Sequence, residues 1–116
     1  MDSYRSFHLG DILSITTGRL VSPRKMDGIY DILTYMTGGQ LYSHQLLGAE
    51  RVCKLHLLMQ YPILETIDAS NVNSRNWQNW IAEKISMYGE YLQIKPLILY
   101  FHENKDQFEK LSNSLT

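Results

Sequence analysis

Residues 14–25, SITTGRLVSPRK, carry the strongest pair of helix boundaries in this sequence. Gly18 tolerates the left-handed conformation that is common just past a helix end. Ser22 is a typical N-cap, and Pro23 suits the first helical position, where a missing N–H costs nothing. We therefore expect one helix to end at Thr17 and, after a short turn, a second helix to begin at Ser22–Pro23.

We call residues 14–25 the corner. On both sides of it, apolar residues recur with the helical period. Leu9, Ile12 and Leu13 form one such stripe ahead of the corner. Residues 67–76, IDASNVNSRN, are small and polar without a period, and they predict a loop. The expected helices run over about 8–17, from Pro23 to the Gly38–Gly39 pair, from Ser43 to just before Pro62, from Asn73 or Ser74 to Gly89, and over 108–115.

Residues 91–101, YLQIKPLILYF, combine an alternation of Leu92 and Ile94 with several strand-forming residues. The expected fold is mainly α, a compact bundle of about four to five short helices with at most a small β strand pair in this region. We expect a single domain over residues 1–116, with a helical unit over about 7–66.

The composition is that of a globular domain without a charge bias. The 116 residues are 44% hydrophobic and 20% charged, and 11 basic against 12 acidic residues give a formal net charge of -1. This balance excludes a global positive field that would attract nucleic acid or anionic lipid. The single Cys53 cannot form an internal disulfide, and no apolar run approaches the roughly 20 residues that cross a bilayer. Because the start also lacks a secretory signal, we expect a cytoplasmic protein without membrane contact.

The corner is a candidate site for an anion or a protein partner. Arg19, Arg24 and Lys25 stand beside the expected start of the second helix, whose free N–H groups and dipole attract anions. Thr17 belongs to the same TTGR corner. The alternative is structural, because a helix stop followed by a helix start requires the same residues. The spacing of a phosphate-binding loop, GxxxxGK[ST], is absent.

Two aromatic residues are further candidates for partner binding. Trp77 lies in the segment NWQNW, residues 76–80, which follows Arg75 directly. Tryptophan together with arginine is a common anchor at protein interfaces. Aromatic side chains can also stack on nucleic-acid bases. Tyr42 is one of eight tyrosines, a residue type enriched at protein interfaces. The alternative for tryptophans at helical spacing is packing in the core.

Cys53 and His56 are three residues apart on the expected third helix and could present a thiol and an imidazole together. A structural zinc site needs four ligands at characteristic spacing, and the other histidines stand apart in the sequence, so we expect no metal and no other cofactor. A Cys–His nucleophile also needs an orienting group and an oxyanion site, which the sequence does not identify. On this reading Cys53 is a small buried apolar residue.

Several motifs are similar to those of a known family. In order, they are LGD at 9–11, TTGRL at 16–20, MTG at 36–38, HQL at 44–46 and YGE at 88–90. They resemble a family of short uncharacterised proteins encoded by bacteriophages and prophages. The resemblance implies a small neutral protein made in the cytoplasm of an infected bacterium. Many such proteins bind a host machine stoichiometrically, and inhibitors of CRISPR–Cas are among them.

The expected function is that of a small phage-encoded, non-enzymatic protein that binds and inhibits or redirects a bacterial protein complex. An anti-CRISPR or other counter-defence inhibitor is its specific form. The expected partner is a bacterial host protein or defence complex, and the expected state is a monomer or a homodimer. The expected partner-binding residues are Thr17, Arg19, Arg24, Lys25, Tyr42 and Trp77.

Two alternatives stay open. The first is a nucleotide- or nucleic-acid-binding module that uses the TTGR corner, although the neutral charge favours a protein partner. The second is a small enzyme that acts through Cys53 or His56.

Overall fold

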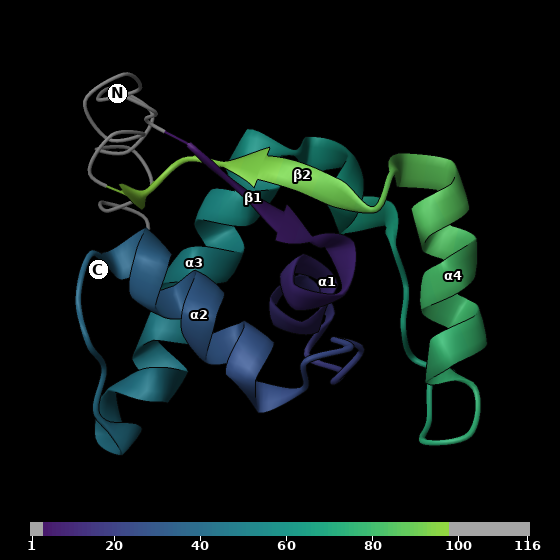
Figure 1. The fold of residues 1–116 in the computed structure, drawn as a ribbon, viewed down its shortest axis with the longest axis horizontal. Coiled ribbons are helices and arrows are strands. Elements are labelled where there is room, and N and C mark those ends of the chain that lie inside the picture. The colour runs from purple at the N-terminus through teal and green to yellow at the C-terminus, as the bar shows by residue number, and fades with distance from the viewer. Residues whose placement is uncertain (1–3, 98–116) are drawn as a thin grey trace.

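Helices dominate the computed structural model, which describes residues 4–97 (Figure 1). The elements are β1 (Arg5–His8), α1 (Leu9–Thr17), α2 (Met26–Thr37), the 3-10 helix η1 (Ser43–Gln45), α3 (Leu46–Gln60), the 3-10 helix η2 (Pro62–Thr66), α4 (Trp77–Tyr88) and β2 (Tyr91–Ile94). This arrangement confirms the expected mainly α fold with a small strand pair. The helix expected over 108–115 lies outside the described residues.

The first helix, α1, is the centre of the molecule. Its residues from Leu9 to Thr16 are all buried, because α2, α3 and α4 pack around it and β1 leads directly into it. Figure 1 shows α1 between α4 on one side and α2 and α3 on the other, with the two strands crossing above. A helix that is apolar and buried on all sides lies in the core of a protein, and α1 takes this position here.

The two strands are antiparallel, and Phe7 is opposite Leu92 in their register. The strand expected near residue 91 is present as β2, and its partner is β1, which the sequence reading did not assign. The motif RSFH in β1 has only one buried apolar residue, Phe7, so four residues give too little alternation to indicate a strand. The Tyr35 hydroxyl on α2 donates to the Ile94 carbonyl at 2.8 Å and so links α2 to β2.

The predicted helix ends are confirmed at three glycines. Gly18, Gly38 and Gly89 follow α1, α2 and α4, with φ of 78°, 83° and 98°. Positive φ is accessible to glycine at little cost, which is why glycine stops these helices. Residues 67–76 form turns without a helix or strand, as expected.

The predicted start of the second helix at Ser22–Pro23 is wrong, because α2 begins at Met26. The Ser22 hydroxyl accepts the backbone N–H of Arg24 at 3.1 Å and donates to a buried carboxylate, so residues 22–25 form a turn. Lys25 then takes a positive φ of 55° before the helix starts. The fourth helix also starts later than expected, at Trp77, and Asn73 caps the turn ahead of it by accepting the N–H of Arg75 at 2.8 Å.

Among residues 4–97, no helix has the length and apolar character needed to span a bilayer.

We expect Tyr35→Phe to lower the free energy of unfolding by about 1 kcal/mol, because the partly buried Ile94 carbonyl loses the hydrogen bond from the Tyr35 hydroxyl while the aromatic ring stays in place. Tyr61→Phe is the matched control, since the Tyr61 hydroxyl donates to the exposed Gln93 carbonyl, which water can reach. Urea unfolding of both variants measures the difference. An equal loss in the two variants would show that the Tyr35 link does not hold α2 to the sheet.

Candidate functional site

A carboxylate from α1 lies buried beneath the corner. The Asp11 side chain is 0% exposed, and Arg24 reaches it from the corner with a distance of 2.5 Å between Nη2 and Oδ2. The Ser22 hydroxyl donates to the other carboxylate oxygen. A buried carboxylate is costly unless it is paired and hydrogen-bonded, and these two side chains meet both needs.

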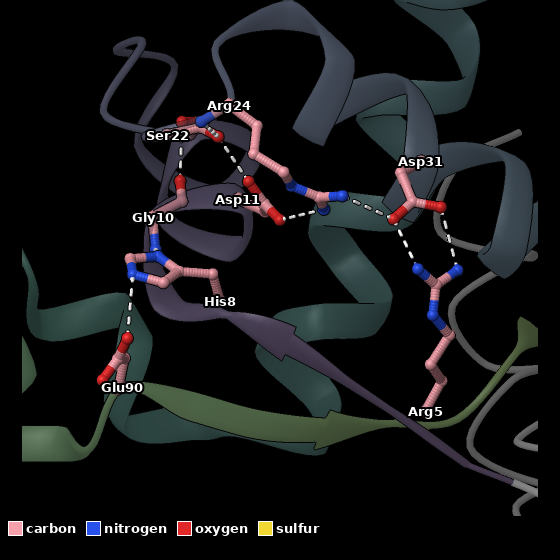
Figure 2. Close-up of polar contacts among 9 residues, drawn as sticks. Arg5, His8, Gly10, Asp11, Ser22, Arg24, Asp31 and Glu90 are labelled. Atoms are coloured by element: carbon pink, nitrogen blue, oxygen red, sulfur yellow. Dashed lines mark hydrogen bonds and ion pairs between the residues drawn. The ribbon is translucent and has the colours of Figure 1, made fainter.

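Arg24 also connects the corner to α2 and β1. Its Nη1 lies 3.0 Å from Oδ2 of Asp31, and Arg5 binds both oxygens of Asp31 at 2.8 and 2.6 Å. Figure 2 shows Arg24 between the two carboxylates and Arg5 reaching up to Asp31 from the strand below. We call Asp11, Arg24, Asp31 and Arg5 the carboxylate network. It joins α1, α2, β1 and the corner through charge-assisted hydrogen bonds.

The network shifts the pKa values of Asp31 and Arg24. The hydrogen bond from Arg5, and then that from Arg24, hold the pKa of Asp31 below its ordinary value. The hydrogen bond to Asp11 is the main cause that raises the pKa of Arg24 above its ordinary value. The Asp31 carboxylate and the Arg24 guanidinium are therefore both held in their charged forms at neutral pH.

Two glycines make room for this arrangement. A Cβ at Gly28 would overlap the Asp11 carboxylate and lie 2.5 Å from the Ser22 hydroxyl oxygen. A Cβ at Gly10 would lie 2.6 Å from the Val21 carbonyl oxygen. Neither distance is compatible with an alanine methyl, so the corner can close over Asp11 only where both positions lack a side chain.

These contacts change the role of one predicted site residue. Arg24 donates to Asp11 and Asp31, so it is an internal structural cation rather than a free anion-binding group. Thr17 is also used locally, because its hydroxyl donates to the Leu13 carbonyl at 2.6 Å and accepts the Arg19 N–H at 3.2 Å. Lys25 is exposed at the N-cap of α2.

Arg19 and Trp77 do come together. A groove of about 310 Å³ runs between the corner and α4, and Leu20, which is 47% exposed, lies on its wall. Trp77 is half-buried against the core and is one of the residues that line the groove. We call this feature the α1–α4 groove, and its residues are Arg19, Leu20, Val72, Asn73, Ser74 and Trp77.

Tyr42 lies away from this groove, at the start of η1, and is 70% exposed. Its ring is parallel to that of His44, with 6.0 Å between the centroids. Tyr42 therefore occupies a surface position apart from the groove. None of its contacts described within residues 4–97 reaches a corner residue.

Cys53 and His56 are both buried on the inner side of α3. Burial raises the pKa of the Cys53 thiol to about 12, so the thiol stays protonated and poorly nucleophilic at neutral pH. Burial also lowers the pKa of His56. Within residues 4–97, no group of three or more His, Cys, Asp and Glu side chains is placed to hold a metal ion. These positions give no support to catalysis through the Cys53–His56 pair.

The sequence reading missed Asp11, Asp31 and Arg5. Two signals could have found the network: an aspartate directly between the apolar residues of the α1 stripe, and a glycine inside the pattern of the second helix. A charge on a buried stripe needs a partner, and a mid-helix glycine often marks a close approach of another group.

A family described as a domain of unknown function, DUF7736, matches residues 7–67. The match spans more than half of the 116 residues, and the chain therefore belongs to this family. No curated protein and no solved structure matches the chain. The matched segment contains Gly10, Asp11, Ser22, Arg24 and Gly28, so the buried carboxylate and its surroundings lie inside the family domain.

We expect Gly28→Ala to destabilise the protein by about 1–3 kcal/mol, since the methyl group would collide with the Asp11 carboxylate and force the corner open. The control is Gly48→Ala in α3, where a Cβ meets no atom within 4 Å. Alanine should stabilise that helix by about 0.5–1 kcal/mol. Thermal and urea unfolding measure both changes. A Gly28→Ala variant that is as stable as Gly48→Ala would contradict the close packing around Asp11.

Proposed function

We propose that this DUF7736 protein is a small phage-encoded, non-enzymatic protein that binds a bacterial protein complex and inhibits or redirects it. An anti-CRISPR or other counter-defence inhibitor is the specific form, and the host bacterial cytoplasm is the place of action. The resemblance of the LGD, TTGRL, MTG and HQL motifs to phage and prophage proteins supports the biological setting.

The observation that carries the proposal is the α1–α4 groove. It combines a half-buried indole and a guanidinium group, two of the side-chain types that dominate binding energy at protein interfaces, with the exposed side chain of Leu20 beside them. Among residues 4–97 no ion pair engages Arg19, whereas Arg24 is held by two carboxylates. Arg19 is therefore a corner cation that lies on the groove wall and is available to a partner.

The groove also indicates the chemistry of the partner segment. An apolar side chain of the partner would cover Leu20 and the open part of the Trp77 ring, which removes apolar surface from water. A carboxylate next to that side chain would pair with Arg19. The partner is thus a protein segment that carries an acidic residue beside a large apolar one.

The nucleic-acid alternative uses the same two side chains, with phosphate on Arg19 and a base on Trp77. Phosphate binding usually involves several cations, whereas Arg19 is the one basic residue on the described wall of the groove and the chain has a net charge of -1. The two functions differ in their dependence on nuclease and salt, and the experiment below separates them.

The test is affinity purification of the tagged chain from nuclease-treated bacterial lysate, with intact complexes weighed by native mass spectrometry. We expect a stoichiometric protein partner to bind the wild type and to bind Leu20→Asp and Arg19→Glu at least about 30-fold more weakly, as for hot-spot residues. Leu47→Asp and Arg51→Glu on α3 are matched controls, because Leu47 is 60% exposed and Arg51 is also at the surface.

Equal capture by the groove variants and the α3 controls would contradict the groove as the interface. Material that nuclease releases, with an affinity that falls steeply with salt, would favour the nucleic-acid alternative. Purification followed by an activity assay of the captured complex then tests inhibition itself. A partner whose activity is unchanged by a saturating amount of this protein would overturn the inhibitor proposal.

A further inference from the structure

Of the four described α-helices, α4 contributes least to the core. Only Ile81 among its 12 residues is buried. In contrast, α1 is buried along its length from Leu9 to Thr16. The side chains of α4 that pack against the core but stay partly exposed are Trp77, Trp80, Ile85 and Tyr88. One fully buried side chain and several half-buried ones therefore hold this helix on α1.

Polar contacts do not add to this attachment. Within residues 4–97, every hydrogen bond and ion pair made by residues 77–88 stays inside the segment 73–89. The Ser86 hydroxyl donates to the Glu83 carbonyl, and the Lys84 ammonium lies 3.9 Å from the Glu83 carboxylate and over the Trp80 ring. The contact of α4 with the rest of the described molecule is thus apolar packing alone.

Each of the other three α-helices has a directional polar contact to another segment. Asp11 on α1 pairs with Arg24 of the corner. Tyr35 on α2 donates to a carbonyl of β2. The Gln60 amide at the end of α3 donates to the Lys95 carbonyl at 3.1 Å and accepts the Lys95 N–H at 2.9 Å. These contacts stay in place when α4 moves, because α4 takes part in none of them.

The two ends of the segment 73–89 are fixed while its interior can move. Val72, just ahead of it, is 7% exposed, and the Glu90 carbonyl, just behind it, accepts the Leu9 N–H at 2.8 Å. Gly89 follows α4 with a φ of 98°, and glycine changes its backbone conformation at little steric cost. Figure 1 shows α4 at one side of the molecule, with α1 between it and the other two long helices.

We propose that α4 is a displaceable lid over α1, so that residues 73–89 open as one unit while α1, α2, α3 and both strands stay folded. Opening breaks only apolar packing, and it therefore requires less free energy than global unfolding. It exposes the face of α1 that α4 covers and moves Trp77 away from Arg19 and Leu20 across the α1–α4 groove. The inference concerns the free protein and does not depend on the proposed function.

Native-state hydrogen exchange of the full chain, followed by NMR, tests the lid. We expect the amides of Ile81 and Ile85 to be at least about 30-fold less protected than that of Leu13 on α1, because lid opening releases them without global unfolding. Both tryptophans of the chain lie on α4, so tryptophan fluorescence should change at a lower urea concentration than the NMR signals of α1. Equal protection in the two helices, or coincident urea transitions, would overturn the proposal.

A pair of isoleucine-to-valine variants separates lid opening from global unfolding. Ile32→Val removes one buried carbon from α2, on the other side of α1, and should lower the protection of Leu13 about fivefold without changing that of Ile85. Ile81→Val makes the same change in the lid and should lower the protection of Leu13 and Ile85 by a similar factor, because both kinds of opening break its packing. An equal loss at Leu13 and Ile85 in Ile32→Val would show that α4 opens only with the whole protein and would contradict the lid.

Discussion

The ion pair between Asp11 and Arg24 is the constraint on which the rest of the structure depends. Asp11 lies on a helix that is buried on all sides, so its charge needs a partner from outside that helix. The corner supplies one by folding residues 22–25 into a turn that places Ser22 and Arg24 over the carboxylate. A buried ion pair adds little net stability over an apolar replacement, but breaking it is costly, and this asymmetry selects one conformation of the corner.

Helix existence and helix ends could be predicted from the sequence because they depend on local rules. The period of the apolar residues and the positive φ of Gly18, Gly38 and Gly89 are properties of a few neighbouring residues. The start of α2 could not be predicted in this way. Ser22 and Pro23 satisfy every local requirement for a helix start, but a tertiary contact to Asp11 uses the Ser22 hydroxyl instead.

For the candidate sites, too, local rules identify residues, whereas tertiary packing decides how they are used. The sequence named Arg19 and Trp77 as candidates for partner binding but did not predict that they are neighbours. The packing of α4 on α1 brings them into one groove. Arg24 was indistinguishable from Arg19 in the sequence, and only the fold shows that one is internal and the other available. The strand β1 has four residues and one buried apolar residue, so its pairing with β2 depends on a register that no local pattern encodes.

The most direct test of this account is a double-mutant cycle with Asp11→Asn, Arg24→Gln and the double variant, measured by urea unfolding. The account predicts that Arg24→Gln costs about 3–5 kcal/mol, because it leaves a fully buried carboxylate without its cation, and that the double variant recovers at least about 1.5 kcal/mol of the summed losses. Losses that add within about 0.5 kcal/mol would show that the two side chains act independently and would contradict the central role of the pair.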